Sequence, residues 1–173
     1  MTTTGERRAP GDGLSEADAR FLRLTFTVAQ RSLASGNHPF AAILVGRDGA
    51  VLLEQENAFL PARDMTAHAE RVLMSRASQA YAPAFLASCT LYSSAEPCAM
   101  CAGAVYWAGV GRLVYGLGER RLRELTGDHP ENPTLDLPCR AVFAAGQRDV
   151  AVIGPALEDE AERVHRGAWA RAR

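Results

Sequence analysis

The sequence predicts an α/β fold, a three-layer α/β/α sandwich with a mixed sheet of about five strands. Helical and strand patterns alternate along most of the chain, which favours a partly parallel sheet with helices on both faces. The first two strand patterns flank an Asp-Gly turn, a strong hairpin signal, and their antiparallel pairing makes the sheet mixed. The length of 173 residues suits one domain rather than two. We expect a disordered tail over residues 1–14 and a single domain over residues 15–173.

The first half of the chain begins with a helix. Apolar residues fall on one helical stripe between Ser15, the expected N-cap, and Ser35, and Gly36 is the expected stop. The hairpin follows, with strands AAILVG and VLLEQEN joined by the turn RDG. A second helix, TAHAERVLMSRASQ, is expected to begin with Thr66 as its N-cap.

The second half alternates strands and helices until it becomes irregular. The segment CTLYSS predicts a short strand, and PCAMCAGAVYWA predicts a helix with Pro97 at its first position, where the missing N–H costs nothing. GRLVYG predicts another strand. Residues 117–148 contain Gly-Asp-His-Pro and Asn-Pro breaks, so we expect irregular structure around one short helix. The strand DVAVIG and a helix from about Ala156 to Trp169 close the chain.

The composition is that of an ordinary globular protein. Apolar residues make up 47% and the formal net charge is −1, so no global charge attracts nucleic acid or an anionic membrane. The longest apolar run is far shorter than the roughly 20 residues of a membrane span. The polar N-terminus lacks the apolar core of a signal peptide. We therefore expect a cytoplasmic protein, whose four cysteines are free, metal-bound or catalytic rather than paired.

Two of these cysteines, Cys98 and Cys101, lie three residues apart at the start of a predicted helix. This spacing puts both on one helix face. The helix dipole there favours negative charge, and the thiolate is the metal-binding form of cysteine. For an isolated C-x-x-C, a pair of buried apolar residues or a redox pair is an equal alternative.

His68 and Glu70 change this comparison. His68, at the start of its own helix, can supply a nitrogen ligand, and three Cys and His ligands with one open position are typical of catalytic zinc. Near a helix N-terminus Glu70 can reach the water at that open position and act as a general acid–base group. Taken singly, His68 would be a hydrogen-bonded helix histidine and Glu70 a solvated surface carboxylate.

Together these residues spell H-x-E followed by P-C-x-x-C, the signature of zinc-dependent nucleobase deaminases. The chain from about Asn37 to Gly116 resembles the cytidine/deoxycytidylate deaminase superfamily. Within it, the chain is most similar to the branch that holds bacterial guanine deaminases and tRNA adenosine deaminases. The segments that carry the resemblance are HPFAAILV, Asn57, DMTAHAE, CTLYSSAEPCAMCAGAVYWA and GRLVYG.

The resemblance implies a role for each matching residue. It implies Zn²⁺ on His68, Cys98 and Cys101, with Glu70 as the proton shuttle. It also implies that Asn57 hydrogen-bonds the base, that Phe40 helps to wall the pocket, and that the backbone N–H groups of Ala69 and Cys98 lie near the reacting groups. The segment VYWA resembles guanine deaminases more than the tRNA enzymes, which makes Trp107 a candidate pocket or interface residue.

Beyond Gly116 the resemblance gives positions only roughly. Guanine deaminases carry an acidic residue there that reads purine N–H groups, and Asp128 is the nearest counterpart, with Glu131 as the alternative. They also end in an aromatic residue that covers the active site of their own or a neighbouring subunit, a part that Trp169 could play. None of the remaining cysteines and histidines is expected to bind metal. Cys89 is assigned to the core, Cys139 to the irregular segment, His38 to a turn or the pocket, His129 to the pocket, and His165 to solvent.

The expected activity is zinc-dependent hydrolytic deamination of a nucleobase, with guanine to xanthine favoured. A zinc hydroxide would attack the ring carbon that bears the amine. The alternatives are another base or nucleoside (isoguanine, cytosine, a triazine analogue or guanosine), a tRNA adenosine deaminase, or a non-catalytic zinc-stapled module with Cys89, Cys139 or His38 as fourth ligand. The final helix mixes acids and arginines and the basic run GERRLRE is short, so nucleic acid is not the expected partner. The apolar segment AVYWAGV and the resemblance both favour a homodimer.

Overall fold

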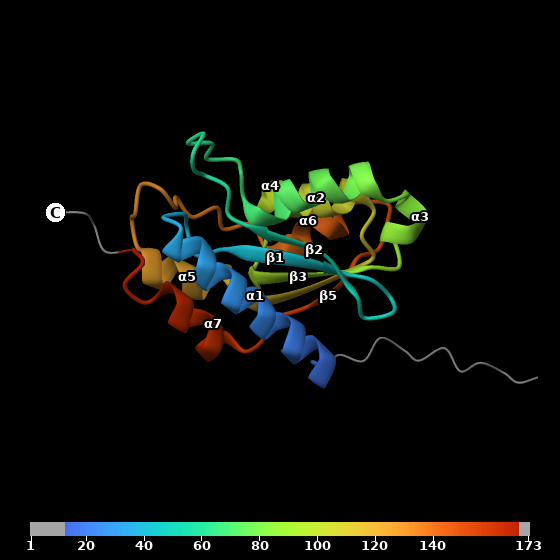
Figure 1. Ribbon diagram of the computed structural model, residues 1–173, viewed down its shortest axis with the longest axis horizontal. Coiled ribbons are helices and arrows are strands. Elements are labelled where there is room, and N and C mark those ends of the chain that lie inside the picture. Colours follow the sequence, from blue (N-terminus) through green and yellow to red (C-terminus); the bar gives the residue numbers. More distant parts are fainter. Residues whose placement is uncertain (1–12, 170–173) are drawn as a thin grey trace, which may run out of the picture.

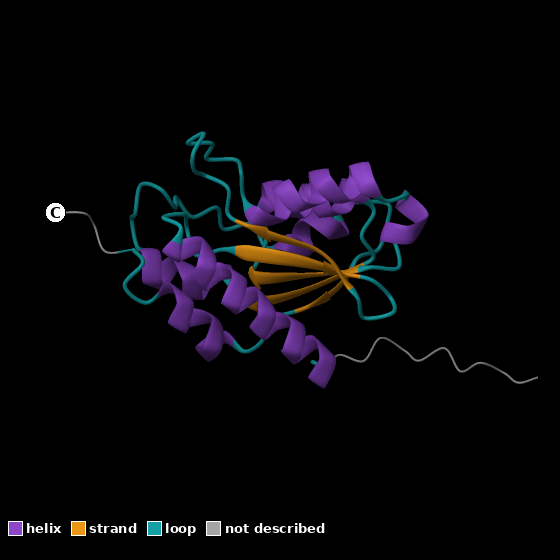
Figure 2. Ribbon diagram, in the orientation of Figure 1, coloured by secondary structure: helices purple, strands orange, loops and turns teal. Residues whose placement is uncertain are grey.

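The computed structural model describes residues 13–169, and the expected tail over residues 1–14 lies almost entirely outside them. A five-stranded sheet forms the middle layer, with helices on both faces (Figures 1 and 2). The strands are β1 (Ala41–Val45), β2 (Val51–Glu56), β3 (Thr90–Ala95), β4 (Arg112–Leu117) and β5 (Ala151–Ile153). Their order is β2-β1-β3-β4-β5, with β1 antiparallel to β2 and β3, and β3, β4 and β5 parallel. The predicted mixed sheet and three-layer architecture are confirmed.

Each face of the sheet has its own apolar core. One core lies under four helices, α2 (Ala69–Ala80), α3 (Pro83–Leu86), α4 (Ala99–Ala108) and α6 (Cys139–Ala144). The other lies under three, α1 (Glu16–Ala34), α5 (Glu119–Thr126) and α7 (Glu158–His165). Alternate residues of β3 serve the two cores, with Leu91 in the first and Tyr92 in the second, as the period of a strand requires. Within residues 13–169, no helix is both long and apolar enough to cross a membrane.

The first helix begins and ends where its caps predict. The Ser15 hydroxyl accepts the Asp18 N–H at 3.1 Å, and the Asp18 carboxylate accepts the Ser15 N–H at 3.1 Å, which makes a capping box. At the other end Gly36 has φ +83°, a left-handed conformation that glycine adopts without strain.

The helices α2 and α4, which carry the predicted metal ligands, begin later than predicted. Thr66 is not an N-cap, because the Asp64 carboxylate accepts both its N–H and its hydroxyl in a local turn. His68 is the N-cap of α2, and Cys98 is the N-cap of α4, so Pro97 lies before the helix rather than at its first position. Both N-cap residues have extended backbone conformations, and their side chains lie at the N-terminal ends of the two helices.

The segment predicted to be irregular contains more helix than expected. It holds both α5 and α6, joined by an irregular loop over residues 127–138. The four-residue helix α3 was not predicted. The last helix, α7, ends at His165, four residues before the expected Trp169, and Gly167 with φ +77° turns the chain there.

Candidate metal centre and active site

The predicted metal ligands meet where α2 and α4 start. These helices pack against each other, so His68 and Cys98 come together, and Cys101 follows one turn into α4. The Nδ1 atom of His68 lies 3.6 Å from the Sγ atom of each cysteine. In a tetrahedral zinc site, Zn–S of about 2.3 Å and Zn–N of about 2.0 Å separate nitrogen and sulfur by about 3.5 Å. The three atoms therefore fit zinc, and they leave the fourth position to a non-protein ligand.

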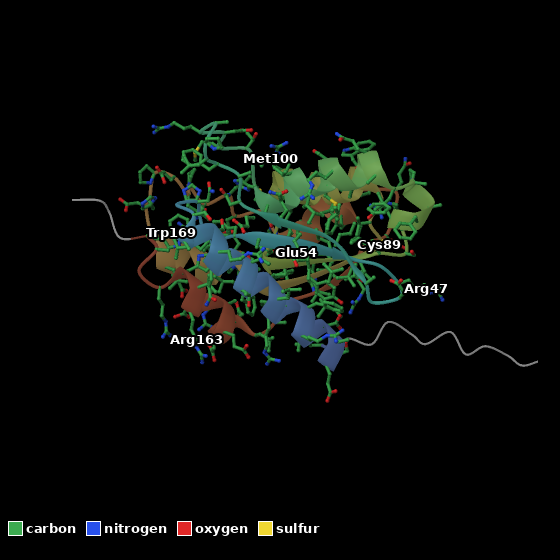
Figure 3. All side chains as sticks on the ribbon, viewed as in Figure 1. Arg47, Glu54, Cys89, Met100, Arg163 and Trp169 are labelled. Atoms are coloured by element: carbon green, nitrogen blue, oxygen red, sulfur yellow. The ribbon has the colours of Figure 1, made fainter. Side chains whose placement is uncertain are left out.

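No fourth protein ligand joins this group in the described part of the chain. Cys89, for example, lies toward the opposite end of the molecule from Trp169 (Figure 3). Cys139 is buried at the start of α6, and His38 pairs with Glu131. A zinc-stapled module would need one of these three residues, so the geometry disfavours that alternative.

The protonation of the three groups is coupled because they lie so close together. A hydrogen bond from the Cys101 thiol, with the nearby His68 ring, lowers the pKa of the Cys98 thiol to about 4. The same hydrogen bond and burial raise the pKa of Cys101. The bond to Cys98 raises the pKa of His68. Cys98 is thus held as a thiolate, the form that binds a metal cation.

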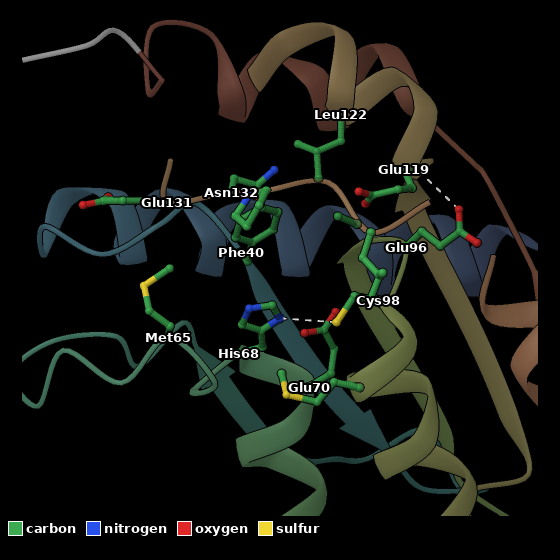
Figure 4. A pocket seen from close by; sticks show the side chains of 14 residues that line it. Phe40, Met65, His68, Glu70, Glu96, Cys98, Glu119, Leu122, Glu131 and Asn132 are labelled. Atoms are coloured by element: carbon green, nitrogen blue, oxygen red, sulfur yellow. Dashed lines mark hydrogen bonds between the residues drawn. The ribbon is translucent and has the colours of Figure 1, made fainter. Parts of the chain in front are cut away.

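Glu70 lies in the first turn of α2 and faces the same cavity as His68 and Cys98 (Figure 4). Its side chain is buried, with the residue 6% exposed. The hydroxyl of Ser93 on β3 donates a hydrogen bond to its Oε1 atom at 2.9 Å. Burial raises the pKa of Glu70 above its usual value. A carboxyl group in this setting can take up and return a proton.

The cavity above these residues has a volume of about 300 Å³, at the small end of the range for ligand pockets. Its apolar wall contains Phe40, Met65, Ala95, Met100, Leu122, Pro133 and Leu135. Its polar wall contains His68, Glu70, Glu96, Cys98, Glu119, Glu131 and Asn132. The described wall holds four carboxyl groups and no arginine, so the pocket has an acidic character.

Two of the expected base-binding residues lie close to this cavity. Phe40, just before β1, lines the cavity. Asn57 follows β2 and is buried; its backbone N–H donates to the Phe40 carbonyl, and its Oδ1 accepts the Phe59 N–H at 3.0 Å. Ala69 is the first residue of α2, where helix N–H groups have no intrahelical acceptor. Contact of Asn57 and Ala69 with a base stays a prediction.

Two other assignments are corrected. Asp128 is exposed and does not line the pocket. The helix α5 ends at Thr126, and the His129 N–H donates to the Thr126 carbonyl, so Asp128 lies in a tight turn at the helix end. Glu131, the alternative, does line it. Trp107 is 86% exposed on α4 and does not line the pocket, and the interface role stays a prediction.

Trp169 supports the pocket wall from behind. Its ring lies 5.9 Å from the Phe40 ring, centroid to centroid, and stacks on His38 at 5.6 Å. It does not itself line the cavity. His165, expected in solvent, is 2% exposed instead, and its Nδ1 accepts the Trp169 indole N–H at 3.2 Å. His129 packs edge-on against Trp169 rather than lining the pocket.

Sequence reasoning missed two acidic residues of the wall, Glu96 and Glu119. Glu96 directly precedes the P-C-x-x-C motif, and its carboxylate accepts the N–H groups of Cys139 and Glu119 at 3.1 and 3.2 Å. Glu119 is the first residue of α5. The position of Glu96 beside the motif was an available signal, whereas that of Glu119 depends on where α5 begins.

The fold and this His, Cys, Cys and Glu arrangement together define a deaminase of the cytidine deaminase type. The chain belongs to the cytidine and deoxycytidylate deaminase zinc-binding family, which matches residues 15–117.

Relatives in this family act on several substrates. A probable cytosine deaminase of Schizosaccharomyces pombe is 38% identical over 156 residues, 90% of this chain and 94% of the relative. Guanine deaminase of Bacillus subtilis is 40% identical over 96 residues, 55% of this chain and 61% of the relative, so the match spans less than two thirds of that enzyme. The structure of guanine deaminase from Nitrosomonas europaea has a TM-score of 0.72 at 26% identity, covering 92% of this chain and 87% of that one.

Proposed function

We propose that this protein is a zinc-dependent hydrolase that removes the exocyclic amine of a free nucleobase, with guanine, converted to xanthine, as the favoured substrate. The observation that carries the proposal is the buried Glu70 carboxyl group, which faces the same cavity as His68 and Cys98. A base with an amine on an unsaturated ring carbon, plus water, would give the carbonyl product and ammonia.

Each residue of the site has a separate role in the proposed reaction. His68, Cys98 and Cys101 would hold the metal, and zinc bound there supplies a water molecule made acidic near neutral pH. Glu70 would take up a proton on its carboxylate and return it to the departing amine. Ser93 fixes the carboxyl group through its hydrogen bond. Phe40 and Leu122 offer apolar surface against which a flat ring can pack.

The charge of the pocket favours a base without phosphate. Phosphate recognition commonly relies on arginine or lysine, and the described wall contains four acidic residues and no arginine. A polynucleotide strand or a nucleotide would bring negative charge next to them. This charge repulsion argues against a tRNA substrate and for a free base.

Guanine is favoured over other bases by two observations. The Nitrosomonas europaea relative, a guanine deaminase, matches this fold over nearly its whole length. Glu131 offers a carboxylate for purine N–H groups in the segment where such an acceptor is expected. Cytosine is the second candidate, because the Schizosaccharomyces pombe relative is similar over almost the entire chain.

An ammonia-release screen of the purified protein against free bases, nucleosides and a tRNA anticodon stem tests the proposal. We expect guanine to be deaminated at least about tenfold faster than cytosine, because guanine carries more N–H donors than cytosine and a site whose acceptors are left unpaired turns a base over more slowly. Faster turnover of cytosine or a triazine would refute the guanine assignment and keep the deaminase. Turnover of tRNA alone would refute the free-base assignment.

The Glu70→Gln variant tests the mechanism. It keeps the shape and the contact with Ser93 but removes the proton shuttle, so we expect turnover to fall by roughly 10²-fold or more. Zinc content, measured by elemental analysis, should stay at one ion per chain. A variant with nearly unchanged turnover would contradict the role of Glu70.

We further propose that α4 forms a homodimer interface. Trp107 of α4 is 86% exposed, and Phe85 of α3 is exposed as well; large exposed apolar side chains of this kind are typical of an interaction surface. Light scattering at micromolar concentration should give twice the chain mass, and Trp107→Ser should shift it toward the monomer. A monomer mass for the unmodified protein would refute the interface.

A further inference from the structure

We propose that Glu119 is a specificity-determining residue: its carboxylate accepts a hydrogen bond from an N–H group that the base carries in addition to the amine that is removed. This inference rests on the proposed function and deepens it. It identifies the substrate class as bases with a second N–H donor on the six-membered ring, either a ring N–H or a second amino group.

The first observation is where the carboxylate points. Glu119 is the first residue of α5 and lines the same pocket as His68, Glu70 and Cys98. Figure 4 shows its carboxylate turned into the pocket, whereas the neighbouring Glu96 carboxylate turns away from it. A base held above the metal centre would meet the Glu119 oxygens at the rim of its ring.

The second observation is that the fold does not use this carboxylate. Within residues 13–169, it accepts no hydrogen bond and forms no ion pair. Glu96, by contrast, accepts two backbone N–H groups. A partly buried acceptor that lacks a partner carries a desolvation cost, and an N–H group of a bound base would remove it.

The third observation is the local charge. Burial raises the pKa of Glu119 to about 7, and the nearby acids Glu96 and Asp136 add to this shift. No arginine lines the described wall. The acidic residues of this pocket wall thus disfavour a negatively charged ligand and favour one that donates hydrogen bonds, which agrees with a base rich in N–H groups.

A purely structural role makes a different prediction. A carboxylate at the first position of a helix can stabilise it through the helix dipole, and then Glu119→Gln would lower the melting temperature. A carboxylate retained for substrate makes no such contribution, so we expect Glu119→Gln to melt at the same temperature as the parent or higher.

The test measures binding without turnover, in a Glu70→Gln parent at pH about 8, by calorimetry. Two ligand pairs differ by one amino group: 2,6-diaminopurine with adenine, and 2,4-diaminopyrimidine with 4-aminopyrimidine. We expect the parent to bind the diamino member of at least one pair more tightly. Glu119→Gln should reduce this preference about tenfold, because a charged acceptor makes roughly twice as strong a hydrogen bond as a neutral one. The matched control is Glu124→Gln, an exposed acid on the same helix that does not line the pocket, and it should leave the preference unchanged.

The outcomes separate this inference from the proposed function. An equal preference in the parent and Glu119→Gln overturns the role of Glu119, even if ammonia release confirms a deaminase. Loss of the preference in Glu119→Gln, combined with no ammonia release by the unmodified protein from any base, supports Glu119 and overturns only the proposed reaction. A parent that binds none of the four ligands overturns both.

Discussion

Asp18→Asn is expected to destabilise the domain by about 3 kcal/mol, the lower end of the cost of removing one partner of a buried ion pair. Asp18 is 3% exposed. Its carboxylate accepts bidentate hydrogen bonds from Arg112 at 2.8 and 2.9 Å and one from the Tyr92 hydroxyl at 2.7 Å. Asparagine cannot accept all of these bonds, and it leaves the Arg112 guanidinium without its charge partner. The lower end applies because the Arg112 side chain is 31% exposed and can regain some water.

A melting experiment at pH about 7 measures this effect. For a domain of this size, about 3 kcal/mol corresponds to a fall of about 6–12 °C in melting temperature. The control is Glu160→Gln, which breaks an equally well-formed bidentate pair with Arg23, at 2.8 and 2.9 Å, on the exposed surface. Exposed pairs contribute about 0–1 kcal/mol. If the two variants lose the same small amount of stability, the reasoning from burial is wrong.

The pH dependence gives an independent check. Burial alone would raise the pKa of Asp18, but the hydrogen bonds from Arg112, Ser15 and Tyr92 outweigh it and hold the pKa well below its usual range. A carboxyl group with a lowered pKa stabilises the fold above its unfolded pKa of about 3.9 and loses this effect as the pH falls below it. The difference in stability between the unmodified protein and Asp18→Asn should therefore shrink between about pH 5 and about pH 3. A constant difference over that range would contradict the assignment.

Three further predictions concern the site and the chain end. Ser93→Ala frees the Glu70 carboxyl group, and steady-state kinetics should show turnover about tenfold lower with zinc content unchanged; normal turnover would mean that the hydrogen bond has no part in orienting Glu70. Removal of metal by a chelator should abolish ammonia release and lower the melting temperature, and re-addition of zinc should restore both; activity that survives chelation would exclude the metal centre. Burial lowers the pKa of His165 to about 4, so the unfolded chain takes up a proton first and stability falls as the pH drops from about 6.5 to about 4; melting curves of His165→Gln should show a weaker fall over that window, and parallel curves would refute this.

The fold was predictable because its signals are local. The Asp-Gly turn fixes the β1–β2 hairpin, and Ser15 with Asp18 fixes the start of α1. Boundaries that depend on competing hydrogen bonds were less predictable. Thr66 has the chemistry of an N-cap, but Asp64 captures both its N–H and its hydroxyl, and nothing in the local sequence ranks the two uses.

The meeting of His68, Cys98 and Cys101 in one candidate metal site was predictable from residue types and order, since few combinations of Cys, His and Glu have this spacing. The specificity residues were not, because they come from the loop over residues 127–138 and from the start of α5. Asp128 and Glu131 are three residues apart in one irregular stretch. A turn between Thr126 and His129 and the pairing of Glu131 with His38 at 2.9 Å decide which one lines the pocket. That pairing joins residues 93 positions apart, beyond the reach of local patterns.

The strand β3 links the stability of the fold to the chemistry of the site. Successive side chains of a strand point to opposite faces, and Tyr92 and Ser93 are successive residues. Tyr92 donates to Asp18 under α1, and Ser93 donates to Glu70 under α2. The two polar contacts thus lie back to back in separate apolar cores. Asp18→Asn should therefore lower the melting temperature and leave turnover unchanged below it. Ser93→Ala should lower turnover and leave the melting temperature nearly unchanged.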